Sequence, residues 1–325
     1  MNKRFLLKIL RKGYNTFCAH KVERLNCEKN PDVTSEIVYQ QLKGAQPCMV
    51  ARFGSVELNC ILNYLSIRFE KHSAVAYIKG KSQGWWWDEK IVYSMQNNAG
   101  FYPTTDNSLK QFCELMIRDM CEVDVLGSWQ PGEREVLPFM NIKKLVSLLT
   151  LEPYWSKNPW TRVLEGKNVL VIHPFAKLIE EQYRNKRKML FSNSDVLPEF
   201  NLMTIQAVQS IGGECNEYEN WFDALNWMKQ EMDRKDYDIA LIGCGAYGFP
   251  LAAHAKRTGH KAVHLGGALQ LMFGIKGRRW EDPNYGEKTL GKKGCYTSLM
   301  NDYWVRPSIE ETPRMAKNVE DGCYW

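Results

Sequence analysis

The sequence contains no long apolar run. Its most apolar N-terminal stretch, residues 5–10, is broken by Lys8, and no small-residue cleavage site follows it. A signal-peptide core needs about 7 to 15 apolar residues and a membrane-spanning helix about 20, so we expect neither here. The ten cysteines form no CxxC pair, and several lie inside apolar runs, which favours buried reduced thiols over a disulfide framework. The sequence therefore predicts a cytoplasmic protein.

Most of the chain also lacks an excess of charge of either sign. The formal net charge is +6, but residues 1–29 alone carry eight Lys or Arg and two Glu, so the other 296 residues are neutral overall. A neutral body argues against DNA or RNA as the main partner. Since 25% of the 325 residues are charged and 44% are hydrophobic, the composition is that of a globular chain rather than a disordered one.

Residues 3–17 have the spacing of an amphipathic helix. One arc carries apolar side chains and the other carries Arg4, Lys8, Arg11 and Lys12. Two interpretations stay open. The helix docks on its own domain with a solvated basic face, or it lies peripherally on the inner face of the cytoplasmic membrane. We accordingly divide the chain into a basic helical segment, 1–29, and an α/β domain, 30–325.

Short apolar runs alternate with helix-like stretches through most of the chain. Most of these runs are apolar on both faces, so we expect a doubly wound, mostly parallel, Rossmann-like α/β sheet. The expected strands are 48–53, 74–78, 123–126, 168–172, 202–205, 238–242 and 262–265, and the expected helices are 55–66, 107–121, 139–150, 175–188 and 219–233. Residues 151–166, rich in Pro and Trp, interrupt the pattern and form a possible internal boundary.

The strongest local motif is DIALIGCGAYGFPLAAHAKRTG, in which a strand runs into Gly243, Gly245 and Gly248 spaced as GxGxxG, with Tyr247 between them. Glycines allow the backbone to approach a phosphate, and the free N–H groups at a helix start stabilise its charge. The alternative is that they serve only close packing. The next strand, KAVHLGG, ends without the Asp or Glu that binds ribose hydroxyls, so we expect no NAD, and a methyl donor is disfavoured.

Two further strand ends carry candidate functional residues. In MVARFGSVEL, Arg52 ends a strand, Gly54 turns the chain, and Ser55 and Glu57 begin a helix. A guanidinium there suits a phosphate, although simple helix capping is the alternative. In VLVIHPF, His173 ends a strand and is a catalytic candidate or a structural residue. We call the turns at Arg52, at His173 and at Gly243 to Gly248, where a strand leads into a helix, the three corners. Because ligands of open α/β sheets bind at the carboxyl ends of strands, these three corners could share one crevice.

Two more segments stand out. Trp85, Trp86 and Trp87 could stack on sugar rings, pack in the core or contact a partner. Residues 276–293 have the composition of a mobile loop whose Arg278 and Arg279 could close on a phosphate.

Together, ARFGSVEL, HPF and LIGCGAYGFPLAAHAKRTGHKAVHLGG resemble the GT-D group of bacterial glycosyltransferases, over roughly residues 35–275. The resemblance implies a Rossmann-like fold that transfers a sugar from a nucleotide donor, typically a UDP-hexose, to a glycan or lipid-linked acceptor. It also implies Mn²⁺ or Mg²⁺ held by an Asp-any-Glu triplet. Here the triplet is Ser55, Val56 and Glu57, so only Glu57 could ligate the metal, and it could instead act as a base.

The Ser55 departure leaves a second function open, a noncatalytic binding or scaffold protein of a polysaccharide assembly complex. A nucleotide-dependent oxidoreductase or methyltransferase is a third interpretation, which the missing ribose acid disfavours.

Overall fold

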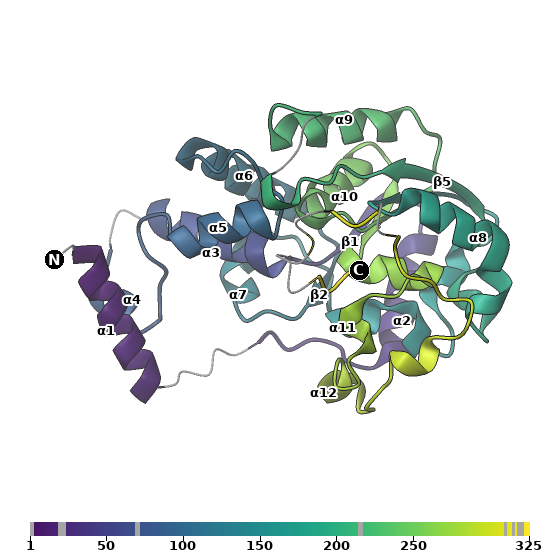
Figure 1. The fold of residues 1–325 in the computed structure, drawn as a ribbon, viewed down its shortest axis with the longest axis horizontal. Helices are drawn as coiled ribbons and strands as arrows, with labels where there is room; N and C mark the ends of the chain where they lie inside the picture. The colour runs from purple at the N-terminus through teal and green to yellow at the C-terminus, as the bar shows by residue number, and fades with distance from the viewer. Residues whose placement is uncertain are drawn as a thin grey trace.

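The computed structural model describes residues 3–18, 24–68, 72–213, 217–308, 311–313, 316 and 322–325. At its centre lies a seven-stranded sheet in the order β3-β2-β1-β7-β6-β4-β5, in which every pairing is parallel (Figure 1). The strands are β1 (Cys48–Ala51), β2 (Val125–Ser128), β3 (Lys144–Ser147), β4 (Asn168–His173), β5 (Asn201–Gln206), β6 (Ile239–Ile242) and β7 (Lys261–His264). The expected doubly wound, Rossmann-like α/β class is confirmed.

Helices cover both faces of this sheet and extend beyond it at the N-terminal end (Figure 1). They are α1 (Lys3–Phe17), α2 (Pro31–Lys43), α3 (Ser55–Arg68), α4 (Ala74–Ile78), α5 (Glu89–Asn97), α6 (Asp106–Asp119), α7 (Glu133–Val136), α8 (Ala176–Leu190), α9 (Trp221–Asp233), α10 (Gly248–Arg257), α11 (Arg278–Glu281) and α12 (Glu287–Leu290). The expected amphipathic N-terminal helix is thus present as α1.

The strands alternate their side chains between two separate hydrophobic cores. Met49 and Ala51 of β1 belong to the core that includes buried side chains of α3, α6, α9 and α10, whereas Val50 belongs to the core that includes those of α2 and α8. Successive side chains of a strand point to opposite faces, so both faces of the sheet are buried. This burial explains why most of the strands have sequences that are continuous apolar runs.

Helices on opposite faces follow neighbouring strands in the middle of the sheet. After β4 the chain enters α8 on one face, and after the adjacent β6 it enters α10 on the other. Right-handed crossovers require this arrangement, because β5 and β7 lie on opposite sides of the β4–β6 pair. Where the connections diverge, an opening is left beyond the carboxyl ends of the strands, and this is where such folds bind ligands.

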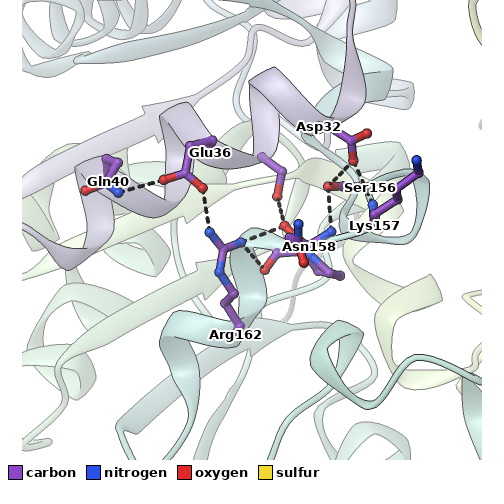
Figure 2. Close-up of polar contacts among 9 residues, drawn as sticks. Asp32, Glu36, Gln40, Ser156, Lys157, Asn158 and Arg162 are labelled. Atoms are coloured by element: carbon purple, nitrogen blue, oxygen red, sulfur yellow. Dashed lines mark hydrogen bonds and ion pairs between the residues drawn. The ribbon is translucent and has the colours of Figure 1, made fainter.

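Residues 151–166 lead from β3 to β4 as short 3-10 turns fixed to α2, as Figure 2 shows. Asp32 accepts hydrogen bonds from Ser156 Oγ at 2.8 Å and from the Lys157 N–H at 2.7 Å. Arg162 donates to Glu36 at 2.7 Å, and its guanidinium lies 3.6 Å from the centroid of the Tyr39 ring. The segment is therefore packed down, and strands from before and after it form one sheet.

Two of the expected elements were wrong. Residues 74–78 form the short helix α4, in which the Ser73 hydroxyl caps the Ala76 N–H, and not a strand. Residues 144–147, expected within a helix, form β3 at the edge of the sheet, paired with β2. Short apolar runs do not by themselves distinguish a strand from a helix, and in both cases the tertiary partner decides. Within the described residues, no helix combines the length and apolar character needed to cross a membrane.

Candidate functional site

A cavity of about 990 Å³ opens at the carboxyl edge of the sheet. Residues at the carboxyl end of every strand, or one or two positions beyond it, line the cavity: Arg52 after β1, Ser128 of β2, Ser147 of β3, His173 of β4, Val208 after β5, Gly243 after β6 and His264 of β7. A volume near the upper end of the range for small-molecule sites accommodates a ligand of several linked groups. The three corners that the sequence singled out share this one cavity.

Nine of the eleven site residues expected from the sequence line the cavity: Arg52, Gly54, Ser55, Glu57, His173, Gly243, Gly245, Tyr247 and Arg279. The other two, Gly248 and Arg278, are not among its lining residues. Trp85, Trp86 and Trp87 do not line it either. Trp86 packs against Leu7 and Tyr77, and Trp87 stacks on Tyr64, so packing accounts for these two rings.

Arg52 presents a positive charge to the cavity. Its Nε is buried without a hydrogen-bond partner, and its charge acts on the nearby carboxylates of Glu57 and Glu133, whose pKa values it lowers. The group lies over the Trp129 ring, with Cζ 5.3 Å from the centroid. Trp129 Nε1 in turn donates to the Phe53 carbonyl at 2.9 Å, which fixes the backbone next to Arg52. A buried cationic donor without a partner is the feature expected of an anion site.

Glu57 lies in the first turn of α3 with its carboxylate folded against Gly54. A Cβ atom at position 54 would lie 1.8 Å from Glu57 Oε2, so the glycine makes room for the carboxylate. Only 9% of Glu57 is exposed, and burial raises its pKa against the opposing effects of its own backbone N–H and of Arg52. A buried carboxylate with a raised pKa, lining a cavity, is a candidate proton acceptor.

Glu133 lies next to the Arg52 and Glu57 corner and holds two of its lining residues by hydrogen bonds. It was not singled out from the sequence. Its carboxylate is fully buried in α7 and accepts hydrogen bonds from the Ser128 hydroxyl and from the Trp129 N–H. Burial raises its pKa, and the hydrogen bonds and Arg52 act in the opposite sense. Glu133 does not line the cavity, so it positions Ser128 and Trp129, which do. An acid in the helical turn directly after a strand was the signal that could have found it.

Two buried histidines lie at the floor of the cavity. Burial lowers the pKa of His173 to about 3, so its ring is neutral; Nδ1 accepts the Phe175 N–H at 3.0 Å, which leaves the proton on Nε2. Burial, with a contribution from Arg52, lowers the pKa of His264 to about 3 as well. Its Nδ1 donates to the Ile242 carbonyl at 3.2 Å, so its Nε2 is an acceptor. Neutral rings act here as hydrogen-bonding groups rather than as charges.

The three glycines after β6 have different tasks. A Cβ at position 243 would lie 2.6 Å from the Gly266 carbonyl oxygen, and one at 248 would lie 2.2 Å from His264 Cε1. Gly243 and Gly248 therefore permit close packing, as the alternative interpretation of the motif holds. Gly245 has φ +56, a conformation that favours glycine, and it begins the helical run that continues into α10. Within this run the Tyr247 N–H already donates to the Cys244 carbonyl at 3.2 Å, so the run begins with the N–H groups of Gly245 and Ala246.

Tyr247 fixes this turn to the body of the domain. Its ring stacks on Trp221 at 4.8 Å between centroids, and its hydroxyl lies 2.9 Å from Ser210 Oγ. The hydroxyl of Ser210 donates to the Gly100 carbonyl at 2.7 Å. The glycine turn, which lines the cavity, is thus held in place by Trp221 of α9 and by Ser210, which follows β5.

The segment 276–293 forms one wall of the cavity. It contains α11 and α12, with Trp280 buried, and Arg279 is held by C-terminal residues: its guanidinium donates to Cys323 Sγ at 3.1 Å and to the Tyr324 hydroxyl at 3.4 Å. Tyr285 of this segment and Tyr324, which follows Cys323, also line the cavity, and the sequence did not mark either of them. Only Arg279 of the two expected arginines reaches the cavity.

The residues around Glu57 do not fit a divalent metal. Mg²⁺ and Mn²⁺ favour several anionic oxygens, whereas the triplet here offers one carboxylate, with the Arg52 charge close enough to lower its pKa. Among the described residues, no group of three or more His, Cys, Asp or Glu is placed to hold a metal ion. The triplet therefore supplies fewer anionic oxygens than a divalent cation favours.

Comparison of the chain with protein-family models, with curated proteins and with solved structures finds no match in any of the three. The resemblance of its three corner motifs to the GT-D group stays a prediction. What is known of the site comes from its geometry.

Proposed function

We propose that this chain is a glycosyltransferase that transfers a sugar from a nucleoside diphosphate donor, a UDP-hexose, to a growing surface glycan. The observation that carries the proposal is the convergence of Arg52, His173 and the glycine turn after β6 in one cavity at the carboxyl ends of the strands. Cationic and N–H donors meet there with a buried carboxylate, and diphosphate departure with proton removal requires such a set. The likeness of the corner motifs to the GT-D group supports the same chemistry.

In this proposal the diphosphate lies between Arg52 and the N–H groups around Gly245. The bond between the anomeric carbon and the β-phosphate oxygen breaks, and the electron pair stays on that oxygen. The growing negative charge is stabilised by the unpartnered Arg52 Nε and by the N–H groups. His173 Nε2–H supplies a further neutral donor.

Glu57 takes the proton in the same step. The acceptor hydroxyl forms the new bond to the anomeric carbon, and its proton passes to the Glu57 carboxylate. Burial of this carboxylate raises its pKa, which strengthens it as a base. Since the triplet lacks its first carboxylate, positive charge comes from Arg52 rather than from a metal ion.

Calorimetry of the full chain with UDP-, GDP- and dTDP-sugars, in the presence of either EDTA or Mn²⁺, tests donor binding. We expect binding of a UDP-sugar in EDTA as well as in Mn²⁺. Absence of binding to every donor under both conditions contradicts the proposal.

Glu57→Gln tests the chemical step separately. This variant should keep donor binding and lose at least about a hundredfold in kcat, the usual order for a general base. The matched control is Glu89→Gln, which also changes a first-turn acid but in the exposed start of α5, and it should behave as the wild type. Donor binding with unchanged cellular glycan in Glu57→Gln would instead favour the noncatalytic scaffold function.

A further inference from the structure

The helix α1 contacts the rest of the chain through its basic side, not through its apolar side. Lys8 forms an ion pair with Asp88 at 3.2 Å, and Arg11 donates to the Ser82 carbonyl at 2.9 Å and lies over the Tyr77 ring. Arg4 lies over the Trp86 ring. At 100° per residue, these three basic side chains share one arc of α1. This overturns the expectation that a docked helix would leave its basic face in solvent.

The opposite arc of α1 is apolar and exposed. Its side chains are between 41% and 87% exposed, and they are Phe5, Leu6, Ile9, Leu10 and Phe17. Gly13 lies in the middle of this arc, and a Cβ atom there would meet nothing within 4 Å. Of the hydrophobic residues of the helix, only Leu7 is buried against the body, with Tyr77 and Trp86. We call these five exposed residues the apolar face of α1.

The charged residues of α1, α4 and their flanks are all basic. Residues 3–18 and 72–84, which comprise α1, α4 and their flanks, contain seven Lys or Arg and no Asp or Glu. On the helical wheel Lys3 and Lys12 border the apolar face on its two sides, and both are exposed. In Figure 1, α1 and α4 project together from the end of the molecule, away from the sheet. A flat partner can therefore approach this face without meeting the body of the domain.

We propose that the apolar face of α1 inserts into the interface of an anionic lipid bilayer, with the flanking lysines at the headgroups. A helix with large exposed apolar residues on one side and basic residues at its borders is suited to this position. A second copy of the chain is a poorer occupant of this face. Symmetric contact between two such faces would bring together two segments whose charged residues are all basic. Membrane binding of this kind does not depend on the proposed transferase activity.

Vesicle co-sedimentation of the full chain tests the proposal, with vesicles of phosphatidylcholine alone and of phosphatidylcholine mixed with phosphatidylglycerol. The wild type should partition onto the anionic vesicles and less onto the neutral ones. The double variant Ile9→Glu, Leu10→Glu should lower the partition coefficient at least about tenfold, since two apolar side chains no longer enter the interface. Its thermal unfolding should match the wild type, because both side chains are exposed.

The matched control is Val33→Glu, which changes an exposed apolar residue at the start of α2, on a separate part of the surface. It should bind vesicles as the wild type does. Failure of the wild type to bind either vesicle overturns the proposal, as does equal binding by the double variant. A wild-type dimer in sedimentation velocity that the double variant abolishes would assign the face to a second copy and overturn it too.

Discussion

Arg52 should be required for ligand binding but not for folding. Arg52→Met removes the charge and keeps an apolar side chain of similar length. A buried donor without a partner costs about 1 to 3 kcal/mol, and the Met variant is relieved of that cost. It also loses the contact with the Trp129 ring, worth about 0.5 to 1 kcal/mol at a distance of 5.3 Å. These effects oppose each other, so the free energy of unfolding should stay near that of the wild type or rise by up to about 2.5 kcal/mol.

Binding of UDP should change far more. Hydrogen bonds to a charged group contribute about 1.5 to 3 kcal/mol each, so losing one such contact should weaken UDP binding roughly 10- to 150-fold. Urea denaturation and calorimetry of the same protein preparation measure the two quantities side by side.

Arg162→Met is the matched control for this experiment. Arg162 is fully engaged: it donates to Glu36 and to the Asn158 carbonyl and lies over the Tyr39 ring. Its removal should lower the free energy of unfolding by about 1 to 3 kcal/mol and leave UDP affinity unchanged. The reasoning is refuted if Arg52→Met loses stability as Arg162→Met does while UDP affinity remains that of the wild type.

Two further predictions concern stability. Burial raises the pKa of Glu152 from its ordinary 4.5 to about 7, so the folded state favours the neutral carboxyl. The stability that this carboxyl contributes is therefore complete below pH 4.5 and is lost as the pH rises to about 7. Glu152→Gln should therefore be more stable than the wild type above pH 7, by up to about 3 kcal/mol, and urea denaturation across this range should show a flatter pH dependence; equal slopes would contradict it. Gly248→Ala should lose about 1 to 3 kcal/mol because the new methyl group meets the buried His264 ring, whereas Gly13→Ala, in open space on α1, should gain up to about 1 kcal/mol; thermal melts that rank them otherwise would contradict this.

The central strands of the sheet could be predicted because they are buried on both faces. β4 and β6, for example, are continuous apolar runs bounded by turn residues, and their structure follows that pattern closely. The edge strand β3 could not, because Ile142, Leu145, Val146 and Leu149 have the spacing of a helix. Its pairing with β2, a contact between segments distant in sequence, decides its conformation.

The site could be predicted in part for a similar reason. Strand ends are visible in the sequence, and parallel strands bring Arg52, His173 and the glycine turn to one edge. The wall that contains Arg279 and Tyr324 depends on how distant segments fold over that edge, and no local pattern encodes it. The orientation of α1 was likewise hidden, because ring and carbonyl partners such as Tyr77 and Ser82 attract its basic side chains.

A crystal structure of the full chain soaked with UDP tests the central claim most directly. The account predicts the diphosphate within hydrogen-bonding distance of the Arg52 guanidinium and of the N–H groups around Gly245, with Glu57 facing the space where the sugar would lie. A diphosphate bound elsewhere on the molecule, or an empty cavity at saturating UDP, would contradict it.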